Sequence, residues 1–179
     1  LYMATHGSLV AVGHQAGMNN SSGGANTYVG YWAGKSTTTS SNNTSVGYEA
    51  GMSNTSSQNT FVGYRAGKAS NTSDVTYIGF DSGLHATGSS NTCVGHRTMD
   101  AASCSGTDNT AIGREGLGAL TGGDENTAVG YFAGHNLTTG GSNTFVGKNA
   151  GDGLTDGNNN VCVGKDADVD SGSRTRAII

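Results

Sequence analysis

The sequence predicts an all-β fold, a parallel β-solenoid of ten coils of about seventeen residues each. A Val-Gly or Ile-Gly dipeptide recurs every 16 to 18 residues along most of the 179-residue chain. The chain contains 31 glycines and no proline, and only 12% of its residues are charged. Each unit is too short for a helical hairpin, and its glycines would weaken a helix by about 1 kcal/mol each.

The repeat is aligned on its glycines, which stand at positions 13, 30, 47, 63, 79, 95, 113, 130, 147 and 164. Unrelated loops would not keep such a register, so the period indicates stacked repeats. We assign residues 1–168 to the tandem-repeat solenoid. Residues 169–179 leave the register, and we expect them to form a C-terminal capping or docking tail, because an open solenoid end exposes unpaired backbone groups.

Seven of the ten coils begin with Asn-Thr-x-Val-Gly or Asn-Thr-x-Ile-Gly, whose alternation and β-branched residues are typical of a short strand. We expect this strand to end at a glycine corner and to be followed by a second short strand around Ala-Gly and a polar turn. The valines or isoleucines and the alanines are expected to face a narrow interior that admits only small side chains. Pairs with this structural role include Val29-Gly30, Val46-Gly47 and Val62-Gly63.

The asparagine that opens the motif forms a second column. Asparagines at equivalent positions of stacked coils can hydrogen-bond along the stack. We therefore predict a structural ladder, with exposed, functional asparagines as the alternative. Its members include Asn59, Asn91, Asn126 and Asn143.

A third column follows the glycine and carries large amphipathic side chains. In a narrow coil these side chains have no room inside, so we expect them on an outer face. They would pack on one another or on another chain, or alternatively bind a ligand. Trp32 and Phe132 come one residue later and would point the opposite way if that stretch is extended. The stripe consists of Tyr31, Tyr48, Tyr64, Phe80 and Tyr131.

Composition argues against several classes of function. The net charge of -4, with few clustered Lys and Arg, argues against nucleic acid. No apolar run is long enough for membrane insertion. The three cysteines lack the spacing of a disulfide or zinc site, and the aspartates 166, 168 and 170 match a calcium loop only weakly. We find no catalytic motif and expect no cofactor, no bound metal and no enzymatic activity.

The repeat Asn-Thr-x-Val-Gly-Tyr-x-Ala-Gly, which runs from about Leu9 to Asp168, resembles the repeats of trimeric phage tail-fibre proteins. More distantly, it resembles the Asn-Ser-x-x-Ile-Gly repeats in the heads of trimeric autotransporter adhesins. This resemblance implies a left-handed parallel β-roll assembled as a homotrimer, and an extracellular place on a virion tail fibre or a cell-surface appendage. The implied partners are further copies of the chain, other fibre proteins, and a host cell-surface receptor or glycan.

The expected function is therefore that of a structural and adhesive fibre segment, a rigid trimeric rod for attachment to a host or surface. The alternative is a monomeric solenoid that binds ice or another regular surface through its threonine column. One column is thin support, because such a face would be expected to carry two or more. The column contains Thr27, Thr44, Thr60, Thr76, Thr92, Thr110, Thr127 and Thr144.

The middle coils depart from the repeat. Coil five has Ser82-Gly83 in place of Ala-Gly, and coil six has Thr98-Met99. Coil six is also the longest and carries Cys104 in its turn, while coil seven reads Gly-Leu-Gly around Leu117. We interpret these changes as tolerated drift, with a lateral bulge as the alternative.

Overall fold

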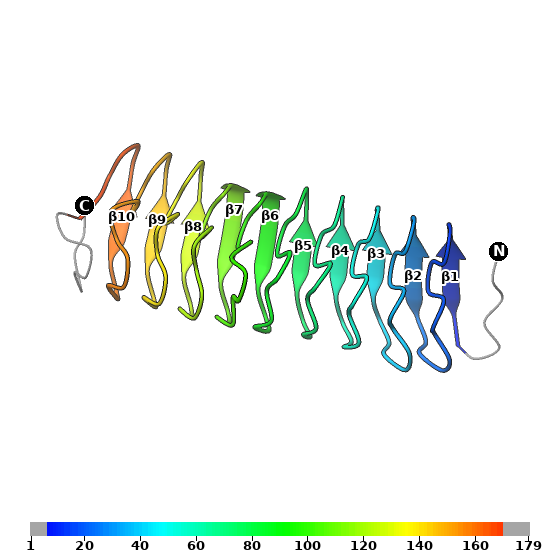
Figure 1. Ribbon diagram of the computed structural model, residues 1–179. Helices are drawn as coiled ribbons and strands as arrows, with labels where there is room; N and C mark the ends of the chain where they lie inside the picture. The colour runs from blue at the N-terminus through cyan, green and yellow to red at the C-terminus, as the bar shows by residue number, and fades with distance from the viewer. Residues whose placement is uncertain (1–6, 170–179) are drawn as a thin grey trace.

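The computed structural model describes residues 7–169, which form one ten-stranded, all-parallel sheet with its strands in sequence order (Figure 1). Each coil contributes one strand, and successive coils stack into a rod. The strands are β1 (Leu9–Val12), β2 (Asn26–Val29), β3 (Thr44–Val46), β4 (Thr60–Val62), β5 (Thr76–Ile78), β6 (Thr92–His96), β7 (Thr110–Arg114), β8 (Thr127–Val129), β9 (Thr144–Val146) and β10 (Val161–Val163).

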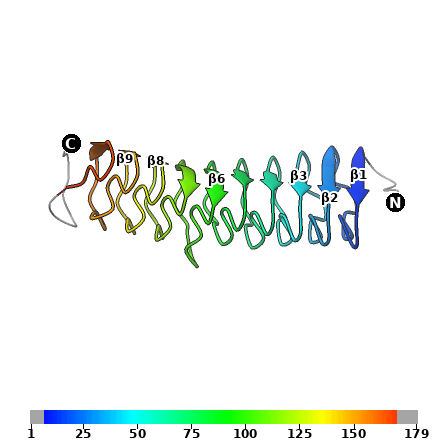
Figure 2. The ribbon, with the colours of Figure 1, turned by 90° about the horizontal axis from the view of Figure 1, so that it is seen from above.

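The pairing register confirms the predicted repeat. Thr27 pairs with Thr44, and Thr44 pairs with Thr60, so every coil advances the chain by one period. Nine steps of about 4.8 Å between neighbouring strands give a rod roughly 43 Å long. The two views at right angles show coils of similar outline stacked along one axis (Figure 2).

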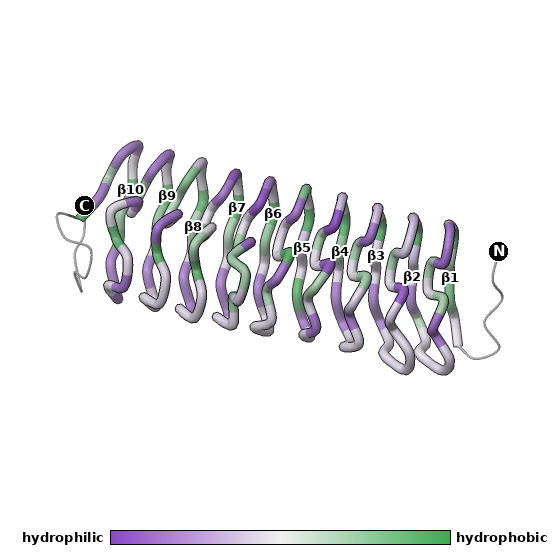
Figure 3. Tube along the Cα trace, viewed as in Figure 1, coloured by the Kyte–Doolittle hydropathy of each residue, from purple (hydrophilic) through white to green (hydrophobic). Residues whose placement is uncertain are grey.

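The prediction of a second strand around Ala-Gly was wrong. The structure places this pair in a turn, and the sheet has one strand per coil. In coil two, Trp32 has φ 58° and Gly34 has φ 56°, so the chain turns back through left-handed conformations and leaves no room for extended backbone. The alanine of the pair is buried in each coil that carries it. Hydrophobic and hydrophilic stretches alternate along every coil (Figure 3).

The prediction that the valine and isoleucine column faces the interior was also wrong. Val29, Val46 and Val62 are only half-buried, and the residue x between Thr and Val is the one that lies inside. The asparagine that begins the motif is buried, and side chains two residues apart in a strand share a face. The alternation therefore places x inside with the asparagine, and Thr and Val outside.

The interior also holds larger side chains than we predicted. Tyr28, Phe61, Tyr77 and Phe145 occupy the inner x position and are fully buried. The glycine of the Ala-Gly pair provides the space, because a Cβ at Gly134 would lie 2.5 Å from the Phe145 ring. In coil three the inner residue is the small Ser45, and the Phe61 ring of the next coil packs against Gly51, where a Cβ would lie 2.5 Å from the ring.

The departures in coils six and seven follow the same packing rule. Their inner residues, Cys93 and Ala111, are small. The glycine six residues further on is replaced by Met99 in coil six and by Leu117 in coil seven, and both side chains are fully buried. Each keeps a left-handed conformation, with φ 47° and 50°. These changes conserve the volume of the core.

The expected C-terminal tail, 169–179, lies outside the described residues except for Val169, which is buried. Within residues 7–169, no helix is long and apolar enough to cross a membrane.

Candidate functional site

The outer side of the ten-stranded sheet forms a regular surface along the rod. Its two columns are the threonines and the valines or isoleucines, and we call it the sheet face. In the first and last coils, Val10 and Val161 take the threonine position. The threonines are half-buried, whereas the second column reaches 48% exposure at Val12 and 57% at Val163. Neither column contains a charged residue.

The stripe predicted from the sequence lies on the outside of the rod, directly after the glycine corner that borders the sheet face. Its rings are 38% to 44% exposed. Tyr31, Tyr48, Tyr64 and Phe80 form one continuous stack over six coils, with His14 at one end and His96 at the other, and Tyr131 in coil eight lies apart from it. Neighbouring ring centroids lie 5.0–5.2 Å apart, and the planes differ by at most 17°. We call these six residues the ring stripe: His14, Tyr31, Tyr48, Tyr64, Phe80 and His96.

Stacking decides which part of each ring is accessible. Offset parallel rings cover one another's faces, so those between the two ends of the stripe present mainly their edges to solvent. The column continues with cations in the C-terminal coils. There Arg114 and Lys148 approach the ring of Tyr131 from the two neighbouring coils, at 5.6 Å and 5.8 Å from its centroid. Stacking within one chain is thus present along this column, whereas stacking between chains stays a prediction.

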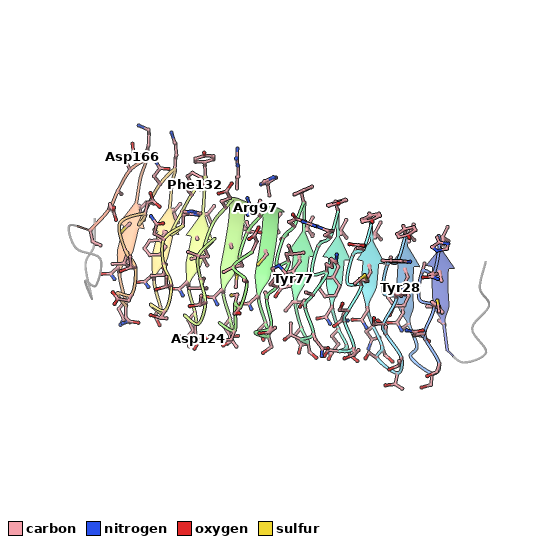
Figure 4. All side chains as sticks on the ribbon, viewed as in Figure 1. Tyr28, Tyr77, Arg97, Asp124, Phe132 and Asp166 are labelled. Atoms are coloured by element: carbon pink, nitrogen blue, oxygen red, sulfur yellow. The ribbon has the colours of Figure 1, made fainter. Side chains whose placement is uncertain are left out.

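The prediction that Trp32 and Phe132 point away from their tyrosine neighbours was wrong. The rings of Tyr31 and Trp32 have centroids 4.8 Å apart, and those of Tyr131 and Phe132 are 4.3 Å apart. The reason is the left-handed turn after the glycine, because alternation between faces holds only for extended backbone. Trp32 therefore lies beside Tyr31, and Phe132 lies beside Tyr131 (Figure 4 labels Phe132).

The asparagine column lies inside the rod and connects the coils. The Oδ1 atom of Asn26 accepts a hydrogen bond from the backbone N–H of Asn43 at 2.9 Å. The Nδ2 group of Asn26 donates to the backbone oxygen of Ser40 at 2.8 Å, in the turn that leads into the next coil. One planar amide thus satisfies two buried backbone groups. The pattern recurs at Asn59, Asn109, Asn126 and Asn143.

Val75 interrupts this column in coil five. Its backbone N–H donates a hydrogen bond to Asn59 Oδ1 at 3.2 Å, but its side chain offers no acceptor to the next coil. The ladder starts again at Asn91, whose Oδ1 accepts from the backbone N–H of Asn109 at 2.8 Å.

The glycine column that ends each strand makes the close corner. Gly63 has φ 133°, and a Cβ built on it would clash with the backbone carbonyl of Gly79 in the next coil. The sequence predicted a glycine corner here. The positive φ and the contact between coils are two reasons why only glycine fits. Val29-Gly30, Val46-Gly47 and Val62-Gly63 thus mark the passage from the sheet face to the ring stripe.

Ion pairs cross the coils beside the ring stripe. The Arg65 guanidinium donates two hydrogen bonds to Asp81, Nε to Oδ1 at 2.8 Å and Nη2 to Oδ2 at 2.5 Å. Lys68 pairs with the buried Glu49 at 2.7 Å. Buried charges need such partners, so the pairs fix Arg65 and Lys68 in place. The hydrogen bonds that Arg65 donates to Asp81 raise the pKa of Arg65, so its guanidinium stays charged.

A hollow of about 570 Å³ lies next to these pairs, on coils four to six. Of its residues, sequence analysis singled out only Phe80. Two signals were present in the sequence: the repeat breaks there, and Arg65, Asp81 and Arg97 share one repeat position. The connection after β6 reaches further from the rod than its neighbours (Figure 2). The hollow is lined by Arg65, Phe80, Asp81, Leu84, His85, His96, Arg97, Asp100 and Ala102.

The three cysteines are buried and are not joined in a disulfide. Burial raises the pKa of Cys104 to about 11 and that of Cys93 well above its usual value, so both remain thiols at neutral pH. No group of three or more His, Cys, Asp or Glu side chains within 7–169 is arranged to hold a metal ion.

Comparisons of the chain with protein-family models, with curated proteins and with solved structures find no match.

Proposed function

We propose that the chain is a rigid rod segment of an attachment fibre, in which three copies lie side by side and contact one another through the sheet face. The observation that carries this proposal is the exposed, uncharged band of valine, isoleucine and threonine that follows the rod through all ten coils. Exposed apolar patches of this extent mark association surfaces.

The occupant we assign to the sheet face is another copy of this chain. A parallel copy has the same spacing between coils, so a contact made at one coil is repeated at every coil. A partner with another repeat would lose register within a few coils. The band measures on the order of 600 Å² before side-chain relief is added, and specific interfaces bury about 800 Å² per partner. The number three and the attachment role rest on the resemblance to trimeric fibre and adhesin repeats.

Rigidity supports the structural role. Backbone hydrogen bonds join the coils from the first described coil to the last. Asparagine side chains add further bonds between coils from Asn26 to Asn160, with an interruption at Val75. A stiff rod that holds three chains in parallel would present its binding groups together, and such multivalency strengthens weak contacts with a surface.

The test is the solution mass, measured by light scattering on a sizing column. We expect a mass near three times 17.9 kDa, about 54 kDa. The double variant Val46→Glu, Val62→Glu introduces charge into the sheet face, and we expect it to run as a monomer. The matched control Ala69→Glu, Ala102→Glu adds the same charge at exposed positions away from the strands. A mass of 17.9 kDa for the unmodified chain would refute the assembly.

One observation favours a second candidate, binding of ice or another regular surface. The sheet face carries two outward columns, threonine and valine or isoleucine, and not the single column that the sequence suggested. Hydroxyl and methyl groups thus repeat in two directions. This function requires the sheet face to be free in solution. A monomeric mass together with thermal hysteresis would favour it over the fibre.

A further inference from the structure

We infer that the hollow on coils four to six is a binding site for a short, neutral oligosaccharide. This inference names a ligand class for the attachment role proposed above and rests on that role. All of the lining residues come from one chain, so the site is complete whether or not the rods assemble. Its volume of about 570 Å³ is within the range of roughly 300 to 1,000 Å³ typical of small-molecule sites.

The location of the hollow is the first argument. It lies where the repeat is broken, at the altered turns of coils five and six, and coil six has the longest spacing between repeat glycines. Ala102, in the connection after β6, lines the hollow and is exposed. In repeat proteins, insertions in single repeats map to loops that often form the binding face. Arg97, labelled in Figure 4, follows the end of β6, from which this connection departs.

Charge defines the ligand class. The hollow contains two arginines and two aspartates, and each arginine is bound to one aspartate. Arg65 holds Asp81 through two hydrogen bonds, and Arg97 Nε contacts Asp100 Oδ2 at 2.6 Å. The two pairs balance each other's charge, so an anionic ligand would approach two carboxylates and a cationic ligand would approach two guanidinium groups. The paired charges therefore favour a neutral ligand.

The same pairs provide polar groups in fixed positions. A guanidinium has five N–H donors, and the bonds to Asp81 use only two of those on Arg65. The imidazoles of His85 and His96 add groups that can donate or accept. Because Asp81 is buried, Arg65 is held as a rigid plane. Donors and acceptors held a few ångströms apart match the neighbouring hydroxyl groups of a sugar ring.

The hollow also contains an apolar part, which a sugar ring needs for its C–H groups. Phe80 is 44% exposed, and Leu84 is half-buried. Since Tyr64 and His96 stack on the two faces of the Phe80 ring, that ring offers its edge and not a free face. The apolar area is therefore limited, and we expect affinity in the millimolar range, about 1 mM.

The experiment is a titration of the full chain with maltotriose, mannotriose and, as an anionic comparison, sialyllactose, followed by amide and arginine Nε–H NMR signals. We expect at least one of the two neutral sugars to produce saturable shifts confined to coils four to six. The variant Ala102→Trp, which fills the hollow and removes no hydrogen bond, should weaken this binding at least about five-fold. The double variant His85→Ala, Arg97→Ala should do the same. Lys148→Ala, in another coil, should bind like the unmodified chain.

Three results would overturn the inference: no saturable shift with either neutral sugar, unchanged binding in both hollow variants, or tighter binding of sialyllactose than of the neutral sugars. Circular dichroism of each variant serves as the control that its coils remain folded. The solution mass of the same samples separates this site from the assembly. A monomer that still binds sugar would refute the trimeric rod alone, and a trimer without binding would refute the site alone.

Discussion

Asn126 and Asn143 lie one coil apart, and the Oδ1 atom of Asn126 accepts two hydrogen bonds from Asn143. One comes from the backbone N–H at 3.0 Å, and the other comes from Nδ2 at 3.0 Å. Both residues are buried, so no solvent replaces these bonds if they are lost. The ladder therefore joins neighbouring coils independently of the sheet, and it can be tested by itself.

Replacing Asn126 by Ala should lower the free energy of unfolding by about 2–4 kcal/mol. The change leaves the buried N–H of Asn143 and the carbonyl of Gly140 without the partners they have now, and each buried unsatisfied group costs about 1–3 kcal/mol. Chemical denaturation followed by circular dichroism measures the loss. Asn19→Ala makes the same chemical change at an exposed position and should have little effect. Equal stability of the two variants would show that the ladder contributes nothing.

Replacing Gly63 by Ala should destabilise the rod by about 2 kcal/mol or more. The new Cβ would clash with the carbonyl of Gly79, and φ 133° is a strained conformation for alanine. Gly122 is a matched control, because a Cβ there would meet only Ser105 Oγ, at 3.8 Å. We expect Gly122→Ala to stay within about 0.5 kcal/mol of the unmodified chain. A melting curve of Gly63→Ala that matches this control would contradict the assigned corner.

The sequence predicted the fold well because the repeat fixes the strands and their register. It failed on orientation, because Thr-x-Val alternates equally well with either face inside. The uniform valine column looked like a core, whereas the true inner column varies from Ala111 to Tyr77. In coils six and seven the small inner residue is offset by a large side chain in the turn, Met99 or Leu117, which an alignment of the strand motif alone does not reveal. The asparagine column was the sequence signal that could have decided the orientation. A structural ladder of asparagines lies inside, and x, two residues further along the strand, lies on the same side.

The hollow on coils four to six could be predicted only in part. Arg65, Asp81 and Arg97 share the position two residues after the repeat glycine, so stacking of the coils places them side by side. Leu84, His85, Asp100 and Ala102 come from the irregular turns, whose course only the folded chain shows. The ring stripe could be predicted because its residues share one position in the repeat, and stacking places equal positions side by side.

Replacing Leu117 by Ala should cost about 2–5 kcal/mol, the usual price of removing a buried leucine side chain. Leu117 is fully buried and fills the space that the small Ala111 leaves in coil seven. The double variant Ala111→Phe, Leu117→Gly restores the arrangement of coil four, where Phe61 is matched by Gly67. We expect it to lose less stability than the sum of its two single changes. Strict additivity in this double-mutant cycle would contradict the compensation.

Stability should fall as the pH rises above 9. Burial raises the pKa of the Cys104 thiol from 9.0 to about 11 in the folded chain. The folded state therefore retains this proton longer than the unfolded state does, and the stabilising contribution is complete below pH 9 and is lost between pH 9 and 11. For this one group the loss is on the order of 2 kcal/mol. Urea denaturation at pH 8 and pH 10.5 should show a smaller difference for Cys104→Ala, and an equal difference would contradict the assignment.

Replacing Tyr48 and Tyr64 by Ser distinguishes the two outer surfaces. Three ring contacts disappear, Tyr31–Tyr48, Tyr48–Tyr64 and Tyr64–Phe80. Aromatic pairs contribute about 0.5–1.5 kcal/mol each, so the chain should become less stable by roughly 1–4 kcal/mol. If the sheet face alone joins the chains, light scattering should still give the mass of the unmodified assembly. Rings that stack only within one chain can be removed without separating that chain from its neighbours. A fall to the monomer mass in a variant that remains folded would therefore place the ring stripe between chains.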